Sequence, residues 1–145
     1  MANPITPERL AACGTEHGHQ CALFCWASQQ PRDSYARLAA MFAIPNGGQR
    51  GKATASRLKA EGVKAGIPDI FFACPSGRYS GLFIELKRPR STGKAKGVVS
   101  IVQDPMHLRL RDHGYCVVTC YGWEPAVRAI LAYLNNNGSM VLVYE

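Results

Sequence analysis

The sequence contains no run of about 18 apolar residues, so no transmembrane helix is expected. It also lacks the basic start and following apolar stretch that are typical of a secretory signal, which favours a soluble, cytoplasmic protein. No internal repeat or low-complexity segment is visible. With 145 residues, of which 47% are hydrophobic, the chain is predicted to form a single domain over residues 1–145, with residues 1–7 as a flexible arm.

No C-x-x-C pair occurs, so a structural zinc site lacks its usual spacing. The six cysteines lie in apolar stretches of a chain without an export signal, and they are predicted to be buried free thiols rather than disulfides. An alternative stays open at the N-terminal helix. There His17 and three cysteines recur at helical intervals and would suit zinc in a protein that does not act on nucleic acid; the cysteines are Cys13, Cys21 and Cys25.

Acidic residues are scarce in one third of the chain. Residues 50–96 hold eleven basic and three acidic residues, a net charge of +8, whereas the remainder has a net charge of −1. The excess positive charge of the whole chain, +7, therefore lies in one segment. A phosphate backbone is the commonest partner of such a segment, although charge alone does not exclude a merely soluble basic surface.

The apolar periodicity predicts helices first and then a mixture of strands and helices. Helices are expected over residues 15–29, 33–42 (with Asp33 as N-cap) and 53–61, and a turn over 44–48. Strands over 69–73 and 82–87 are predicted to pair as a hairpin. A helix ending near His113, a strand over 115–120, a helix from about Pro125 to Leu134 and a strand over 140–144 follow. This order predicts an α/β domain with a mixed central sheet flanked by helices.

The strand over residues 82–87 places charged side chains on one face. Side chains alternate along a strand, so Glu85 and Lys87 lie on the face opposite the apolar residues. Charges on a strand that otherwise looks buried are costly unless they are paired or bind a metal. A solvated edge strand is the alternative interpretation.

Asp69 begins the neighbouring strand, directly after a turn. The turn between the strands is long enough for Asp69 to approach Glu85, although Asp69 as a turn-capping residue is the alternative. Two adjacent carboxylates repel, and a divalent cation relieves the repulsion. Because carboxylate oxygens are hard ligands, Mg²⁺ or Mn²⁺ fits better than zinc. Such a cation activates water at a phosphate, and Lys87 would hold that water and neutralise developing charge.

Pro68-Asp69, followed after an interval by Glu85-Leu86-Lys87, resembles the signature of the PD-(D/E)XK nucleases. The wider context is similar to the VRR-NUC (virus-type replication-repair nuclease) domain over residues 15–120, in the segments 44–50 (IPNGGQR), 62–69 (GVKAGIPD) and 81–87 (GLFIELK). The resemblance implies the restriction-endonuclease-like fold. It also implies Mg²⁺- or Mn²⁺-dependent hydrolysis of phosphodiester bonds in DNA, for which branched or junction DNA and roles in replication, repair or recombination are expected.

The resemblance further implies a catalytic site of Asp69, Glu85, Lys87 and Gln103, with Glu16 and Leu86 joining the two carboxylates as metal ligands. Each added residue has a structural alternative. Glu16 suits the first turn of a helix, where the helix dipole favours an acid. Gln103 completes a Ser-x-x-Gln capping box, but Asp104-Pro105 is itself a good helix start.

The basic segment supplies the residues expected to contact DNA. A Gly-Gly turn lets the backbone approach a phosphate closely, and neighbouring polar and basic side chains suit contacts to the DNA backbone and shape rather than to base edges. The expected residues are Asn46, Gln49, Arg50, Lys52, Arg88, Lys94 and Lys96. His107 and His113 are predicted on a helix surface. A homodimer paired through residues 140–144 is expected, and a non-catalytic nucleic-acid-binding module is the alternative function.

Overall fold

The structure is a computed structural model that describes residues 3–45, 51–89 and 104–135. Its strands are β1 (Met41–Ala43), β2 (Ile70–Phe72), β3 (Leu82–Lys87) and β4 (Cys116–Tyr121), and they form one sheet in the order β1-β2-β3-β4. The first two neighbouring pairs are antiparallel, and β3 and β4 are parallel. The predicted β2–β3 hairpin and the predicted mixed α/β sheet are therefore confirmed.

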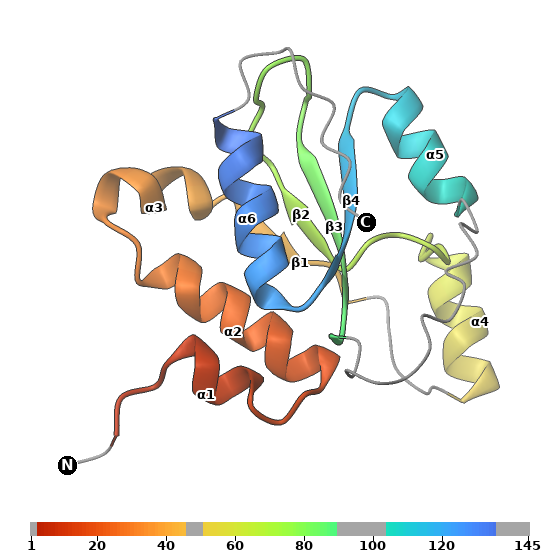
Figure 1. Cartoon of the computed structure of the whole chain (residues 1–145). Helices are drawn as coiled ribbons and strands as arrows, with labels where there is room; N and C mark the ends of the chain where they lie inside the picture. The colour runs from red at the N-terminus through yellow and green to blue at the C-terminus, as the bar shows by residue number, and fades with distance from the viewer. Residues whose placement is uncertain (1–2, 46–50, 90–103, 136–145) are drawn as a thin grey trace, which may run out of the picture.

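Helices α2 (Glu16–Ser28) and α6 (Trp123–Leu134) pack together in front of the sheet in Figure 1, and both contact β3. Beneath them, the Leu82, Ile84 and Leu86 side chains of β3 are at most 1% exposed. They form a core with Leu23 of α2 and Ile130 of α6. The strand alternation thus buries one face of β3 and directs Phe83, Glu85 and Lys87 to the other, as the sequence predicted.

Hydrogen bonds at both ends of α6 fix its position. The Trp123 backbone N–H at its start donates to Nδ1 of His19 in α2, at 3.1 Å, and the Tyr133 hydroxyl near its end donates to the Cys74 carbonyl beyond β2, at 2.6 Å. Helix α2 begins where predicted, because the Thr15 hydroxyl accepts the Gly18 N–H at 3.0 Å. The bond between Trp123 and His19 connects the N-terminal part of α2 to the end of the sheet where β4 leads into α6.

Two short elements near the N-terminus differ from prediction. Helix α1 (Pro7–Ala11), which was not predicted, packs on α2 so closely that a Cβ at Gly18 would lie 2.6 Å from the Leu10 carbonyl oxygen. Helix α3 (Arg32–Leu38) starts before Asp33, so Asp33 lies in the first turn and the predicted N-cap is wrong. The predicted extension of that helix to Phe42 is also wrong, because residues 41–43 form β1 and pair with β2.

The remaining elements lie close to their predicted positions. Helix α4 (Lys52–Ala60) is followed by Gly62 with a φ of +96°. Helix α5 (Pro105–Asp112) is capped by Asp104, whose side chain accepts the Met106 N–H at 2.9 Å. The predicted strand over 140–144, and with it the expected dimer contact, lies outside the described residues. In the described part of the chain, no helix is both long and apolar enough to span a bilayer.

Candidate active site

The first two candidate carboxylates lie opposite each other at one end of the sheet. The antiparallel register ends at the pair Ile70–Ile84; Asp69 directly precedes Ile70, Glu85 directly follows Ile84, and the charge of Asp69 acts on Glu85. Asp69 is held there by its backbone and its side chain. Its carbonyl accepts the Ile44 N–H at 2.7 Å, and its Oδ2 accepts the Leu86 N–H at 2.8 Å. The strand register therefore brings the carboxylates together.

Glu85 is the more enclosed of the two charged residues on β3. Its side chain is 19% exposed, and its Oε1 lies 2.9 Å from Nζ of Lys87, whose side chain is 43% exposed. Burial raises the pKa of the Glu85 carboxyl; the hydrogen bond from Lys87 opposes this, and the negative charge of Asp69 adds to it. Burial and the Asp69 charge together therefore outweigh the opposing effect of Lys87, and a further cation beside Glu85 would stabilise its charged form.

Lys87 experiences the negative charge of all three candidate acids. The hydrogen bond to Glu85 is the largest cause of its raised pKa, and the charges of Glu85, Glu16 and Asp69 act in the same direction. Lys87 is therefore an ammonium ion at neutral pH, and it serves here as a fixed positive charge rather than as a base.

His107 is a member of this site that sequence reasoning assigned to the helix surface. Its side chain is only 12% exposed, and its Nε2 lies 4.0 Å from Oε2 of Glu85. The chain topology indicates that His107 lies near Glu85, because α5 connects the parallel strands β3 and β4. A crossover helix starts near the carboxyl end of the first strand, where Glu85 lies. His113, in contrast, is exposed at the end of α5, as predicted.

The loop before Asp69 packs against the start of α5. Gly66 has a φ of +81°, and a Cβ at this position would lie 2.5 Å from Oδ1 of Asp104. Only glycine suits both the left-handed backbone and this close approach. Gly66 therefore connects the position of Asp69 to that of the helix that carries His107.

Glu16 is the first residue of α2, and its exposed side chain lies near enough to affect Lys87. The described residues nevertheless contain no group of three or more His, Cys, Asp or Glu side chains spaced to hold a metal ion. Asp69 and Glu85 are the pair that the fold brings together. Two carboxylates are sufficient for magnesium, which is commonly held by one or two carboxylates together with waters and substrate phosphate.

The available oxygens fit such a cation. The hydrogen bond from the Leu86 N–H engages Oδ2 of Asp69, and His107 faces the second oxygen of Glu85. The Leu86 side chain is 1% exposed in the core, so its backbone carbonyl is the atom with which Leu86 would contribute. A donor set made only of oxygen atoms matches Mg²⁺ or Mn²⁺.

Of the residues expected to contact nucleic acid, the structure places Lys52 and Arg88. Lys52 is exposed at the start of α4, and Arg88 is exposed directly after Lys87. The other five, together with Gln103, fall outside the described residues; they are Asn46, Gln49, Arg50, Lys94 and Lys96.

All six cysteines are free, as predicted, but burial is confirmed only for two of them. Burial raises the pKa of Cys116 to about 11 and that of Cys120 to about 12, so both thiols stay protonated. Cys13 is exposed, which differs from the prediction. On α2, the Cys21 sulfur lies 3.6 Å from Nε2 of His17, a contact between neighbouring turns of one helix.

The comparisons with known proteins bear on the fold. No family model matches the sequence, and a search of curated proteins found no similar one. A solved structure described as a VRR_NUC domain protein superimposes with a TM-score of 0.65 at 24% sequence identity; the alignment covers 88% of this chain and 98% of that chain. The resemblance inferred from the sequence motifs is thus supported by the structure, and the chain has the VRR-NUC fold.

Proposed function

We propose that the chain is a Mg²⁺- or Mn²⁺-dependent endonuclease that hydrolyses phosphodiester bonds in DNA. One observation supports this most strongly. Asp69 and Glu85 lie opposite each other at the end of the sheet, and Lys87 forms a salt bridge with Glu85. A protein that only binds DNA gains nothing from two acids beside the phosphates it must attract. The fold of the VRR_NUC domain protein agrees with the proposal.

In this proposal Asp69, Glu85 and the Leu86 carbonyl hold the cation, and Glu16 joins them from α2. A bound cation would neutralise charge on the phosphate and lower the pKa of a bound water, which would release a proton to solvent and supply the attacking hydroxide. Lys87 is already a cation, so it hydrogen-bonds that water or a phosphate oxygen and stabilises the negative charge that grows on the phosphorus oxygens.

The positioning of these groups comes from the backbone. The Leu86 N–H donates to the Asp69 carboxylate and so fixes its orientation. The Ile44 N–H donates to the Asp69 carbonyl and so fixes the Asp69 backbone before β2. Gln103, near the start of α5, is proposed as a further catalytic residue. The exposed Lys52 and Arg88 are proposed to contact the DNA backbone, together with Asn46, Gln49, Arg50, Lys94 and Lys96.

Branched or junction DNA is the proposed substrate, acted on in replication, repair or recombination, and a homodimer in the cytoplasm is the proposed assembly. Linear, nicked, flapped and four-way-junction duplexes would be incubated with the protein in magnesium, manganese or chelator. Cleavage is expected only with a metal, and it should be absent in Asp69→Asn and Lys87→Met. Cleavage that survives in either variant or in chelator would contradict the assigned site, and binding without cleavage of any substrate would favour the binding module.

A further inference from the structure

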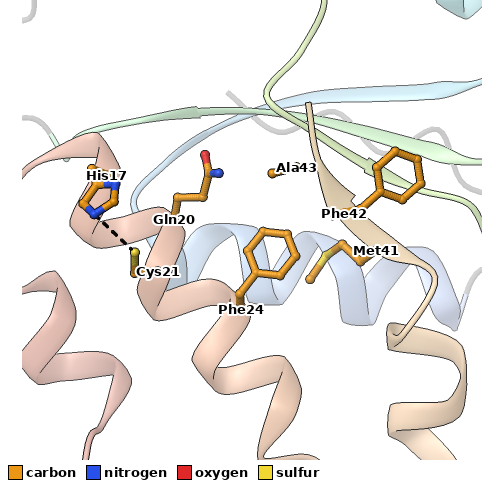
Figure 2. Close-up of a pocket in the computed structure, with 7 residues that line it drawn as sticks. All are labelled: His17, Gln20, Cys21, Phe24, Met41, Phe42 and Ala43. Carbon is orange, nitrogen blue, oxygen red and sulfur yellow. Dashed lines mark hydrogen bonds between the residues drawn. The ribbon is translucent and has the colours of Figure 1, made fainter. Parts of the chain in front are cut away.

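A groove of about 380 Å³ lies between α2 and β1 and is lined by none of the residues of the candidate site (Figure 2). Its lining comes from one face of the helix and from the edge strand; the residues are His17, Gln20, Cys21, Phe24, Met41, Phe42 and Ala43. This volume lies at the lower end of the range of pockets that bind small molecules, about 300–1,000 Å³. It therefore suits one planar ring system rather than a folded domain.

The groove combines apolar walls with few polar groups. Phe24 of α2 and Met41 of β1 supply apolar surface, and the Gln20 side chain extends from α2 toward Ala43 on the strand (Figure 2). The Gln20 amide has no hydrogen-bond partner among the residues that the structure describes, and the imidazole of His17 lies beside it on the helix. Flat faces that need apolar contact, and an edge that needs hydrogen bonds, are the properties of a nucleobase.

Two connections place this groove next to the proposed metal ligands. Along α2, Gln20 lies about one helical turn, or about 5.4 Å, from Glu16. Along the strands, Ala43 precedes Ile44, whose N–H donates to the Asp69 carbonyl at 2.7 Å. Ala43 also pairs with Ile70, the residue after Asp69, so the groove and Asp69 share one end of the sheet.

We infer that the groove between α2 and β1 binds an unpaired nucleobase of the DNA strand whose phosphate lies at Asp69 and Glu85. The inference rests on the proposed nuclease function and makes its substrate more specific: the strand must be single-stranded beside the cleavage position, as at a flap or a branch. A paired base would first have to leave its stack to enter the groove, so a base that is already unpaired is favoured. The Gln20 amide would bond the polar edge of the base, and Phe24 would contact its face.

Binding is measured in chelator, so that no cleavage occurs, with a single-stranded oligonucleotide that contains 2-aminopurine and with a blunt duplex of the same sequence. Two variants address the groove: Gln20→Ala removes the amide, and Ala43→Tyr fills the space from an exposed position on the edge strand. Tyr35→Ala is the matched control, because Tyr35 is 42% exposed on α3 and does not line the groove. Thermal unfolding confirms that each variant folds.

Contacts to one base are worth about 1–3 kcal/mol, so both groove variants should weaken single-strand binding by about fivefold or more. Duplex binding should change by less than about twofold, and Tyr35→Ala should match the wild type. The 2-aminopurine fluorescence should change on binding to the wild type but not to Ala43→Tyr. Unchanged single-strand affinity in both groove variants, or an equal loss for duplex and single strand, would overturn the inference.

Failure of this inference is separable from failure of the proposed function. If Asp69→Asn abolishes metal-dependent cleavage while Ala43→Tyr binds single strands normally, the groove assignment is wrong and the nuclease stands. If Asp69→Asn still cleaves, the proposed metal site is wrong. The binding comparison in chelator decides the groove in either case.

Discussion

Replacing Asp69 by Asn and by Ala should separate its structural role from its chemical one. Its Oδ2 accepts the N–H of Leu86, a residue that is 1% exposed. Asn keeps an oxygen acceptor at this position and removes the negative charge, whereas Ala removes both. If Asp69 is a metal ligand as well as a hydrogen-bond acceptor, the two variants should have the same activity and different stabilities.

The expected magnitudes follow from this single hydrogen bond. Asp69→Ala leaves the Leu86 N–H without its acceptor, which costs about 1–3 kcal/mol. For a domain of this size, about 2 kcal/mol corresponds to a fall in Tm of about 6–8 °C. The free energy of unfolding of Asp69→Asn should lie within about 1 kcal/mol of the wild-type value. Its amide oxygen still accepts the Leu86 N–H, and the repulsion from Glu85 disappears. Both variants should lose metal-dependent cleavage by about 100-fold or more.

Thermal or urea unfolding of the three proteins gives the stabilities, and cleavage of a flapped duplex in Mg²⁺ gives the activities. Glu85→Gln is a useful companion variant, because it removes the opposing carboxylate without disturbing the Leu86 bond. An Asp69→Ala variant as stable as the wild type would contradict a stabilising role for the hydrogen bond to Leu86. An Asp69→Asn variant that cleaves at the wild-type rate would contradict the role of Asp69 as a metal ligand.

Three further predictions concern the surroundings of the site. Glu16→Gln, at an exposed position, should leave Tm unchanged and weaken Mn²⁺ binding by about tenfold; unchanged Mn²⁺ affinity would remove Glu16 from the ligands. Gly66→Ala should destabilise the fold more than the control Gly62→Ala, because both have positive φ but only Gly66 also has a contact at 2.5 Å; equal losses in urea unfolding would contradict this. Burial lowers the pKa of His19, so its contribution to stability should be complete above about pH 6.5 and decline as the pH falls below that value. In His19→Gln, the free energy of unfolding measured in urea should depend less on pH below about pH 6.5. An unaltered pH profile would contradict the contribution of His19.

The longer elements were predictable because each has its own periodicity and its own start or stop residue. Thr15, Asp104 and Gly62 mark helix ends in the sequence and do so in the structure. The three residues of β1 carry no such signal. They pair with β2, far along the chain, and this tertiary pairing decides a conformation that local propensity assigns to a helix. Short elements of this kind depend on contacts that the local sequence does not contain.

The candidate site was predictable to a similar degree. The placement of Glu85 and Lys87 on one face follows from strand alternation, whereas their ion pair was not predicted. The sequence could not provide the register that sets Asp69 opposite Glu85, since a shift by one residue would turn Asp69 to the other face. His107 required the crossover topology, because on α5 alone it resembles any polar surface residue.

Mn²⁺ binding, followed by the loss of the free-ion signal in electron paramagnetic resonance, tests the central claim most directly. The wild type should bind Mn²⁺ saturably, and Asp69→Asn and Glu85→Gln should each lower the affinity by about tenfold or more while remaining folded. Mn²⁺ binding of equal affinity in the wild type and both variants would contradict the assignment of these two carboxylates as the metal site.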